Sequence, residues 1–124
     1  MTASDRVVEY LGHIRFAIER IDRYVEDIDE VSFLKDELVQ DAVIRNLEII
    51  GEACRNILRI DPQFASKHID FPIAKAIGMR NALALGYFKI EFDVVWRTIQ
   101  EDLGDLHQRA RRIEASLKTM KSEQ

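Results

Sequence analysis

Three polar side chains interrupt an apolar stretch in the second half of the chain. Residues 78–88 read GMRNALALGYF, and the polar members are Arg80, Asn81 and Tyr87. On an α-helix, positions 80 and 87 are separated by seven residues and so lie about 20° apart in projection. The planar guanidinium of arginine can hold a phosphate through paired hydrogen bonds. The spacing predicts a groove flanked by Arg80 and Tyr87, with Asn81 and Leu85 beside it.

A structural role for the same side chains stays open, in which Arg80 caps a carbonyl or pairs with an acid and Tyr87 anchors a loop. Metal chemistry has less support, because there is no HExxH motif and no cysteine pair. Glu9 and His13 share a helix face, a spacing typical of a surface pair. The chain's histidines are scattered, at His13, His68 and His107. We expect no metal and no cofactor.

Composition favours an all-α protein. The chain has 124 residues, of which only 5 are Gly and 2 are Pro, about half of average usage. So few chain-breaking residues argue against a turn-rich β-sandwich or barrel. The length suits a single domain over residues 1–124. A formal net charge of -4 argues against indiscriminate coating of nucleic acid, so any RNA contact must be local.

Cellular location is indicated by cysteine usage and hydropathy. The single cysteine, Cys54, excludes an intrachain disulfide and fits a reducing cytoplasm. No apolar run approaches the ~18 residues that a membrane span needs, and the charged N-terminus does not resemble a signal peptide. We expect a cytoplasmic protein without a membrane segment. Cys54 falls on an apolar helix stripe, which predicts a core residue rather than a nucleophile.

Four stretches carry apolar residues at helical spacing. The first covers residues 7–25, with Ser4 or Asp5 as a plausible N-cap. The second runs from about residue 36 to 60 and ends before Pro62, which disfavours helix in the residue preceding it. Between them lies an acidic connector with one short helical turn, which is a solvated linker or an acidic surface for a basic partner.

The third helix opens near residue 71, with Pro72 in its first turn, and should stop at Gly86. The fourth runs from Phe92 to near the C-terminus, and Gly104 is a place for it to bend or break. The predicted fold is therefore a helical bundle of about four long helices plus short turns. The apolar end of the third helix, residues 82–85, also predicts a dimer interface.

The segment around Arg80 resembles the R-x4-H-x-Y signature of HEPN-superfamily ribonucleases, specifically the HepT-like toxins, where it typically reads R-N-x-L-x-H-G-Y-F. Similarity also extends through residues 41–53 and 95–97 and covers nearly the whole chain. The resemblance implies a dimeric bundle with two signatures in a shared cleft. It further implies a metal-independent endoribonuclease toxin, restrained by a minimal nucleotidyltransferase antitoxin that transfers AMP to the signature tyrosine, here Tyr87.

One position departs from that signature, because Leu85 stands where the family has histidine. In metal-free cleavage the RNA 2′-OH is the nucleophile, so a base must take its proton and an acid must protonate the leaving 5′-oxygen. Imidazole serves either role near neutral pH, and leucine serves neither. Losing such a group typically costs about 10²–10⁴-fold in rate. We expect the site of Arg80, Asn81 and Leu85 to bind RNA and to cleave it poorly, whether Leu85 is an engineered knockout or natural.

Basic residues near the C-terminus are candidates for contact with the RNA backbone, namely Arg109, Arg111 and Arg112. The alternative is a solvated helix face. The expected partners are a second copy of the chain, the nucleotidyltransferase antitoxin and RNA. The rival interpretation of the whole protein is a non-catalytic helical dimer that binds RNA or antitoxin.

Overall fold

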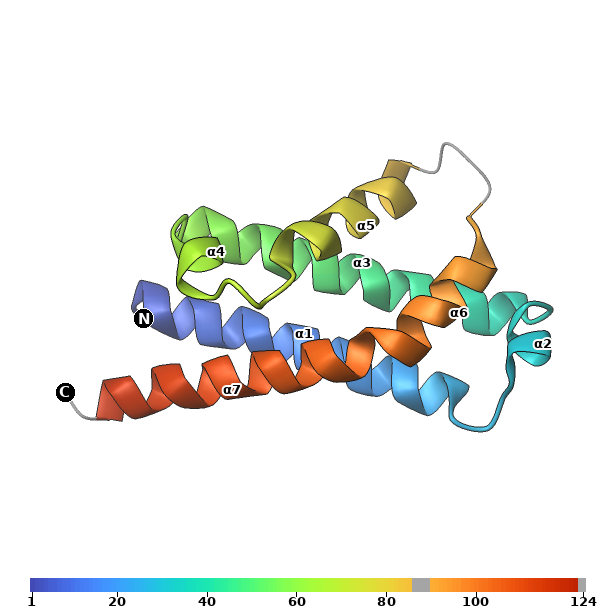
Figure 1. Cartoon of the computed structure of the whole chain (residues 1–124), viewed down its shortest axis with the longest axis horizontal. Coiled ribbons are helices and arrows are strands. Elements are labelled where there is room, and N and C mark those ends of the chain that lie inside the picture. The colour runs from blue at the N-terminus through green and yellow to red at the C-terminus, as the bar shows by residue number, and fades with distance from the viewer. Residues whose placement is uncertain (86–89, 123–124) are drawn as a thin grey trace.

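All regular elements of the protein are helices in the part of the chain that the computed structural model describes, residues 1–85 and 90–122. Figure 1 shows the longer ones lying roughly side by side. In chain order the helices are α1 (Ala3–Val25), α2 (Glu30–Phe33), α3 (Glu37–Ile60), α4 (Phe64–Lys67), α5 (Ile73–Leu85), α6 (Phe92–Glu101) and α7 (Leu103–Ser122). The prediction of an all-α helical bundle is confirmed.

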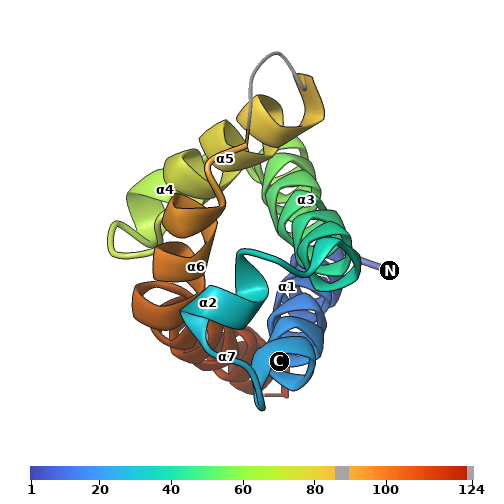
Figure 2. The ribbon, with the colours of Figure 1, turned by 90° about the vertical axis from the view of Figure 1, so that its right-hand side faces the viewer.

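The bundle is built around α1 and α3. Helix α1 packs against α3 and α7, and α3 also packs against α5. Seen from the end in Figure 2, these helices and α6 surround a common interior. The short α2 lies at that end, where Phe33 is fully buried and stacks 5.2 Å from the ring centroid of Trp96 on α6. The acidic connector therefore contains one buried aromatic residue that helps to close the bundle.

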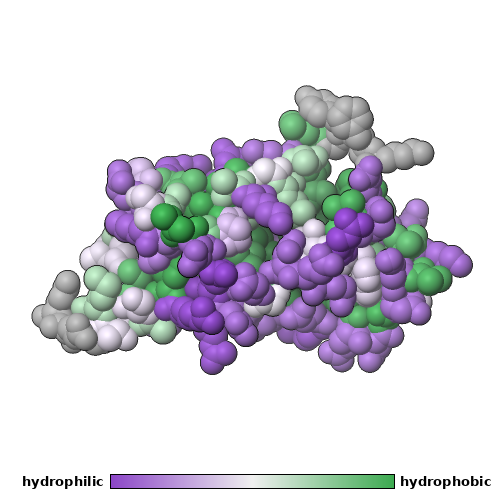
Figure 3. Space-filling model, viewed as in Figure 1, coloured by the Kyte–Doolittle hydropathy of each residue, from purple (hydrophilic) through white to green (hydrophobic). Residues whose placement is uncertain are grey.

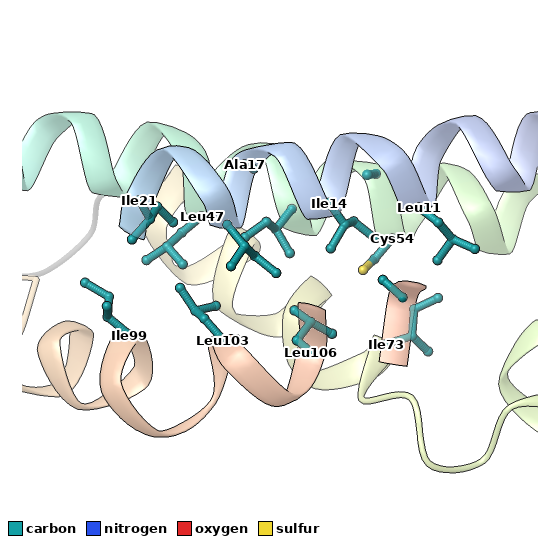
Figure 4. Packing of buried hydrophobic residues seen from close by; sticks show 14 of the residues in the cluster. Leu11, Ile14, Ala17, Ile21, Leu47, Cys54, Ile73, Ile99, Leu103 and Leu106 are labelled. Carbon is teal, nitrogen blue, oxygen red and sulfur yellow. The ribbon is translucent and has the colours of Figure 1, made fainter. Parts of the chain in front are cut away.

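The apolar stripes predicted from helical spacing form the core. In Figure 4, side chains of α1 such as Leu11, Ile14 and Ile21 face Leu103 and Leu106 of α7. Cys54 is also completely buried, and this burial raises the pKa of its thiol to about 12. A thiol that stays protonated at neutral pH is a poor nucleophile, so the prediction of a core cysteine is confirmed.

Two helix starts show how local sequence sets the boundaries. Asp36 caps α3 by accepting from the Val39 amide at 3.1 Å, which agrees with a helix predicted to begin at about residue 36. The predicted cap of α1 was wrong, because Thr2 rather than Ser4 or Asp5 is the N-cap. The Thr2 hydroxyl accepts from the Asp5 amide and the Asp5 carboxylate accepts from the Thr2 amide, so this capping box satisfies two amides at once.

The last predicted helix is two helices. The helix is interrupted at Asp102, the C-cap of α6, which has a φ of -109°. The carbonyl oxygen of Asp102 then accepts the Leu106 amide in the first turn of α7. Gly104 therefore lies inside α7 rather than at the break. The change of direction lets Ile99 of α6 and Leu103 of α7 both face the core. Within the described residues, no helix combines the length and apolarity that a membrane crossing requires.

Candidate functional site

Arg80 is placed by a close approach between α5 and α3. A Cβ atom added to Gly51 of α3 would lie 2.0 Å from the Cβ of Arg80 and 2.9 Å from the carbonyl oxygen of Ala76. Real Cβ atoms do not approach other atoms so closely, so only glycine at position 51 lets the two helices meet here. No local signal in the sequence shows that Arg80 packs on Gly51, because 29 residues separate the two positions.

The guanidinium of Arg80 bridges two helices. Its Nη2 lies 3.3 Å from Glu52 Oε2 on α3, and its Nη1 donates to Asn81 Oδ1 at 3.2 Å. Arg55 Nη1 lies 3.5 Å from the same Glu52 oxygen. That oxygen is buried and accepts no hydrogen bond from the described residues, so both arginines approach it as ion pairs of imperfect geometry. Arg80 keeps 28% of its side chain exposed, which leaves the guanidinium open to a ligand.

The predicted groove is only partly visible. The side chains of Arg80 and Asn81, which are neighbours in sequence, are in contact. Leu85, at the last residue of α5, is 57% exposed, and Ala82 and Ala84 are exposed as well. Tyr87 lies outside the described residues. Figure 3 shows hydrophobic surface, in green, over this end of α5.

A cavity of about 260 Å³ lies beside Arg80, between α1 and α3. Its polar lining comes from both helices and from α5, and consists mainly of Tyr10, His13, Arg45, Glu48, Glu52 and Arg80. Leu85 does not line it. Sequence reasoning assigned His13 to a surface pair with Glu9, and the two do lie 4.0 Å apart and exposed. It missed that His13 and Arg80 face one cavity, because 67 residues separate them.

The C-terminal arginines line a different cavity, of about 450 Å³, between α7 and the segment around α4. Arg109 and Arg112 contribute to it, whereas Arg111 is exposed elsewhere on α7. Arg109 donates to Asp105 at 2.7 Å and lies 3.9 Å from Asp70. These acids already neutralise it. The structure therefore does not bring the C-terminal arginines and Arg80 into one cavity.

Comparison with known proteins identifies the family. The family description "Ribonuclease HepT-like" matches residues 14–113. The chain is 40% identical over 98 residues to "Probable ribonuclease HepT" of Thermococcus cleftensis, covering 79% of this chain and 86% of that protein. It is 34% identical over 104 residues to a "Putative RNase" of Caldanaerobacter subterraneus, covering 84% and 90% of the two chains.

A longer relative also matches. The "Gamma-glutamylcyclotransferase and putative RNase" of Methanocaldococcus jannaschii is 36% identical over 97 residues, which is 78% of this chain and 42% of that protein. The present chain thus spans less than half of that relative's length. No solved structure matches the chain. Because the family match covers most of the chain, including Gly51, Glu52 and Arg80, this protein belongs to the HepT-like ribonuclease family.

Proposed function

We propose that the protein is the toxin subunit of a toxin–antitoxin pair and a metal-independent endoribonuclease, impaired by Leu85. The observation that carries this proposal is Arg80, held against Gly51 and Glu52 with its guanidinium still accessible, in a chain of the HepT-like ribonuclease family.

The proposed reaction uses the RNA's own 2′-OH as nucleophile. Arg80 holds the phosphate and stabilises the negative charge that develops on it in the transition state, and Asn81 orients the phosphate beside it. Leu85 occupies the family's histidine position and transfers no proton. The products are a 2′,3′-cyclic phosphate and a 5′-hydroxyl, because the neighbouring 2′-oxygen attacks in place of a metal-bound water.

We also propose that the protein acts as a homodimer through α5. This helix is apolar on nearly all sides, yet Ile73 is its only fully buried residue. An apolar helix that its own bundle covers so poorly is stabilised by a second copy. Sedimentation at micromolar concentration should give about twice the mass of the 14.4 kDa chain, and monomer alone would contradict the proposal.

Regulation would come from a minimal nucleotidyltransferase antitoxin that transfers AMP to Tyr87. The added phosphodiester would bring negative charge close to the Arg80 site and so compete with an RNA phosphate. Mass spectrometry after incubation with the cognate nucleotidyltransferase and ATP should find AMP on Tyr87. Modification only at Tyr10 or Tyr24 would count against this part of the proposal.

The remaining features extend the same proposal. Residues 1–124 act as one domain in the cytoplasm, and Arg111 and Arg112 contact the RNA backbone away from the scissile phosphate. Arg109 contributes less, because Asp105 and Asp70 surround its guanidinium. The wholly solvated interpretation of this helix face predicts instead that an Arg111→Ala, Arg112→Ala double variant binds RNA unchanged.

The central experiment compares this chain with its Leu85→His variant in an RNA cleavage assay containing a chelator. Because Leu85 is more than half exposed, histidine can enter without a buried, unpaired imidazole. We expect cleavage to rise by about 10²–10⁴-fold, with cyclic phosphate ends. A matched Leu38→His variant, which changes another exposed leucine, should show no rise. A folded Leu85→His dimer that leaves every tested RNA intact would contradict the proposal.

One observation favours a second candidate function. An exposed leucine at the end of an apolar helix suits a binding surface better than a proton-transfer site. In this alternative the protein is a non-catalytic dimer that binds RNA or antitoxin. It predicts that Leu85→His weakens antitoxin binding without producing cleavage, so the same variant separates the two functions.

A further inference from the structure

His13 shares a cavity with Arg80, which makes it unlike the chain's other two histidines. His107 Nε2 lies within hydrogen-bond distance of Glu19, at 2.9 Å, across the contact between α1 and α7. His68 stacks on Phe64 with ring centroids 4.5 Å apart, and burial lowers its pKa. His13 instead lines the cavity beside Arg80 and keeps 47% of its side chain exposed.

The surroundings of His13 leave its ring nitrogens available. Glu9 Oε1 is 4.0 Å from His13 Nε2, too far for a hydrogen bond, and no other described residue bonds the imidazole. The ring of Tyr10 meets the imidazole edge to face, with centroids 5.4 Å apart, and so limits its orientations. The imidazole is therefore restricted in orientation by Tyr10, exposed to solvent, and able to exchange a proton with a ligand.

The cavity is of a size to admit part of an RNA chain. Its volume of about 260 Å³ is just below that of ordinary small-molecule pockets, about 300–1,000 Å³, so it suits one phosphate with its ribose better than a whole oligonucleotide. Arg80 and Arg45 present positive charge to such a group. Two glutamates of the lining, Glu48 and Glu52, oppose this charge, so a bound phosphate must lie on the side of the arginines.

We propose that His13 is a catalytic residue that moves the proton in residual RNA cleavage by this chain, in the place of the family histidine that Leu85 lacks. The proposal rests on the proposed ribonuclease function. Its basis is the presence of one free imidazole and one accessible guanidinium in the same cavity.

The proposed step conserves atoms and charge. An imidazole nitrogen of His13 takes the proton of the 2′-OH, the 2′-oxygen forms a bond to phosphorus, and the bond from phosphorus to the 5′-oxygen breaks. The imidazolium then returns the proton to the leaving 5′-oxygen. Arg80 stays protonated throughout and stabilises the pentacoordinate phosphate.

Charged and polar groups surround the imidazole on three helices. Glu9 and Tyr10 lie near it on α1, Arg45, Glu48 and Glu52 line the cavity from α3, and Arg80 does so from α5. A base must be unprotonated to accept a proton, so His13 would act in its neutral form.

The test measures single-turnover cleavage of a single-stranded RNA by the full chain, in chelator, across pH 5 to 9. His13→Gln keeps a polar side chain of similar length and should lower residual cleavage at least tenfold at every pH at which cleavage is seen, with RNA binding unchanged. His107→Gln, which preserves a partner for Glu19, is the matched control and should change neither. The C2 proton resonance of His13 should also shift when an uncleavable 2′-deoxy oligonucleotide is added.

The Leu85→His variant separates the two possible failures. If it cleaves RNA and the unaltered chain does not, or if His13→Gln leaves residual cleavage unchanged, the role of His13 is wrong and the proposed ribonuclease function stands. If neither the unaltered chain nor Leu85→His cleaves any RNA, the ribonuclease function fails and the role of His13 fails with it.

Discussion

Two arginine–glutamate pairs join helices in this bundle, and they differ in nearly every physical respect. Between α1 and α7, Arg15 bonds Glu114 through both Nε and Nη2, and the Glu114 side chain is only 6% exposed. Its bond to the guanidinium raises the pKa of Arg15. Between α3 and α5, Arg80 meets Glu52 at 3.3 Å without a hydrogen bond, and Glu52 is 43% exposed.

The difference separates a structural pair from one that can take a ligand. A buried carboxylate that accepts two hydrogen bonds from one guanidinium is closed to an outside group, because the ligand cannot reach it and the guanidinium is already engaged. A loose pair, part-exposed and of imperfect geometry, gains little from its own attraction, so a phosphate can share the guanidinium at small cost. The following predictions test this contrast, from the largest expected effect to the smallest.

Removing the arginine of the buried pair should cost the most stability. Arg15→Ala leaves the Glu114 carboxylate buried without its partner, which should lower the free energy of unfolding by about 3–5 kcal/mol. Urea denaturation monitored by circular dichroism measures this. Replacing the pair with apolar residues, in an Arg15→Met, Glu114→Leu double variant, should recover most of the loss. Equal losses in the single and double variants would show that the carboxylate is not the cause.

Removing Arg80, the arginine of the loose pair, should reduce RNA cleavage strongly and stability only slightly. In the Leu85→His background, Arg80→Ala should reduce RNA cleavage by about 10²–10³-fold, because the transition-state charge loses its stabiliser. Stability should change by less than about 1 kcal/mol. Arg59→Ala, at an exposed arginine of α3, is the control and should leave both quantities unchanged. An Arg80→Ala protein that unfolds like Arg15→Ala would remove the contrast between the pairs.

The contact of α5 with α3 can be broken without touching a charge. Gly51→Ala forces the new methyl group against Arg80, so α5 must shift, at a cost of about 1–3 kcal/mol. The variant should also lose cleavage in the Leu85→His background. Gly78→Ala adds its methyl group to open space on α5 and should stabilise by up to about 1 kcal/mol. Thermal melts of both variants are the measurement.

Neutralising the loose pair should barely affect folding. Glu52→Gln keeps the side chain's shape and removes its charge, and a part-exposed ion pair contributes only about 0–1 kcal/mol. Because a negative charge beside Arg80 is gone, binding of fluorescently labelled RNA should become tighter at low salt. Glu48→Gln changes a neighbouring carboxylate of the same cavity that does not pair with Arg80, and should have the weaker effect. Weaker RNA binding by Glu52→Gln would mean that Glu52 is needed to orient Arg80.

The smallest effect concerns Asp22, in the neighbourhood of the buried pair. Asp22 is exposed, but partial loss of its hydration raises its pKa, the nearby His107 opposes the rise, and Glu19 adds to it. A carboxyl with a raised folded pKa binds more protons in the folded state, so its unfavourable contribution appears as pH rises through its titration range. Asp22→Asn should therefore raise the melting temperature at neutral pH, and the gain should vanish in strong acid. Asp41→Asn, at an exposed position of α3, is the control.

Much of the fold was predictable because helical periodicity is local. The start of α3 at the Asp36 cap, its end before Pro62 and the burial of Cys54 all follow from residues within a few positions of one another. The division of the last helix at Asp102 was not predictable in this way, since the chain turns there so that Ile99 and Leu103 can reach a core formed by distant helices. Tyr87, the other half of the predicted groove, remains a prediction.

The sequence by itself determined which chemistry the signature can support, because a leucine at position 85 cannot carry a proton in any fold. It also determined the helices, whose spacing and caps act over single turns. Only the tertiary structure decided that Gly51 admits Arg80, that Glu52 is its partner and that His13 faces the same cavity. Those relations join residues 28 to 67 positions apart, and their distances are set by how whole helices pack rather than by any local pattern.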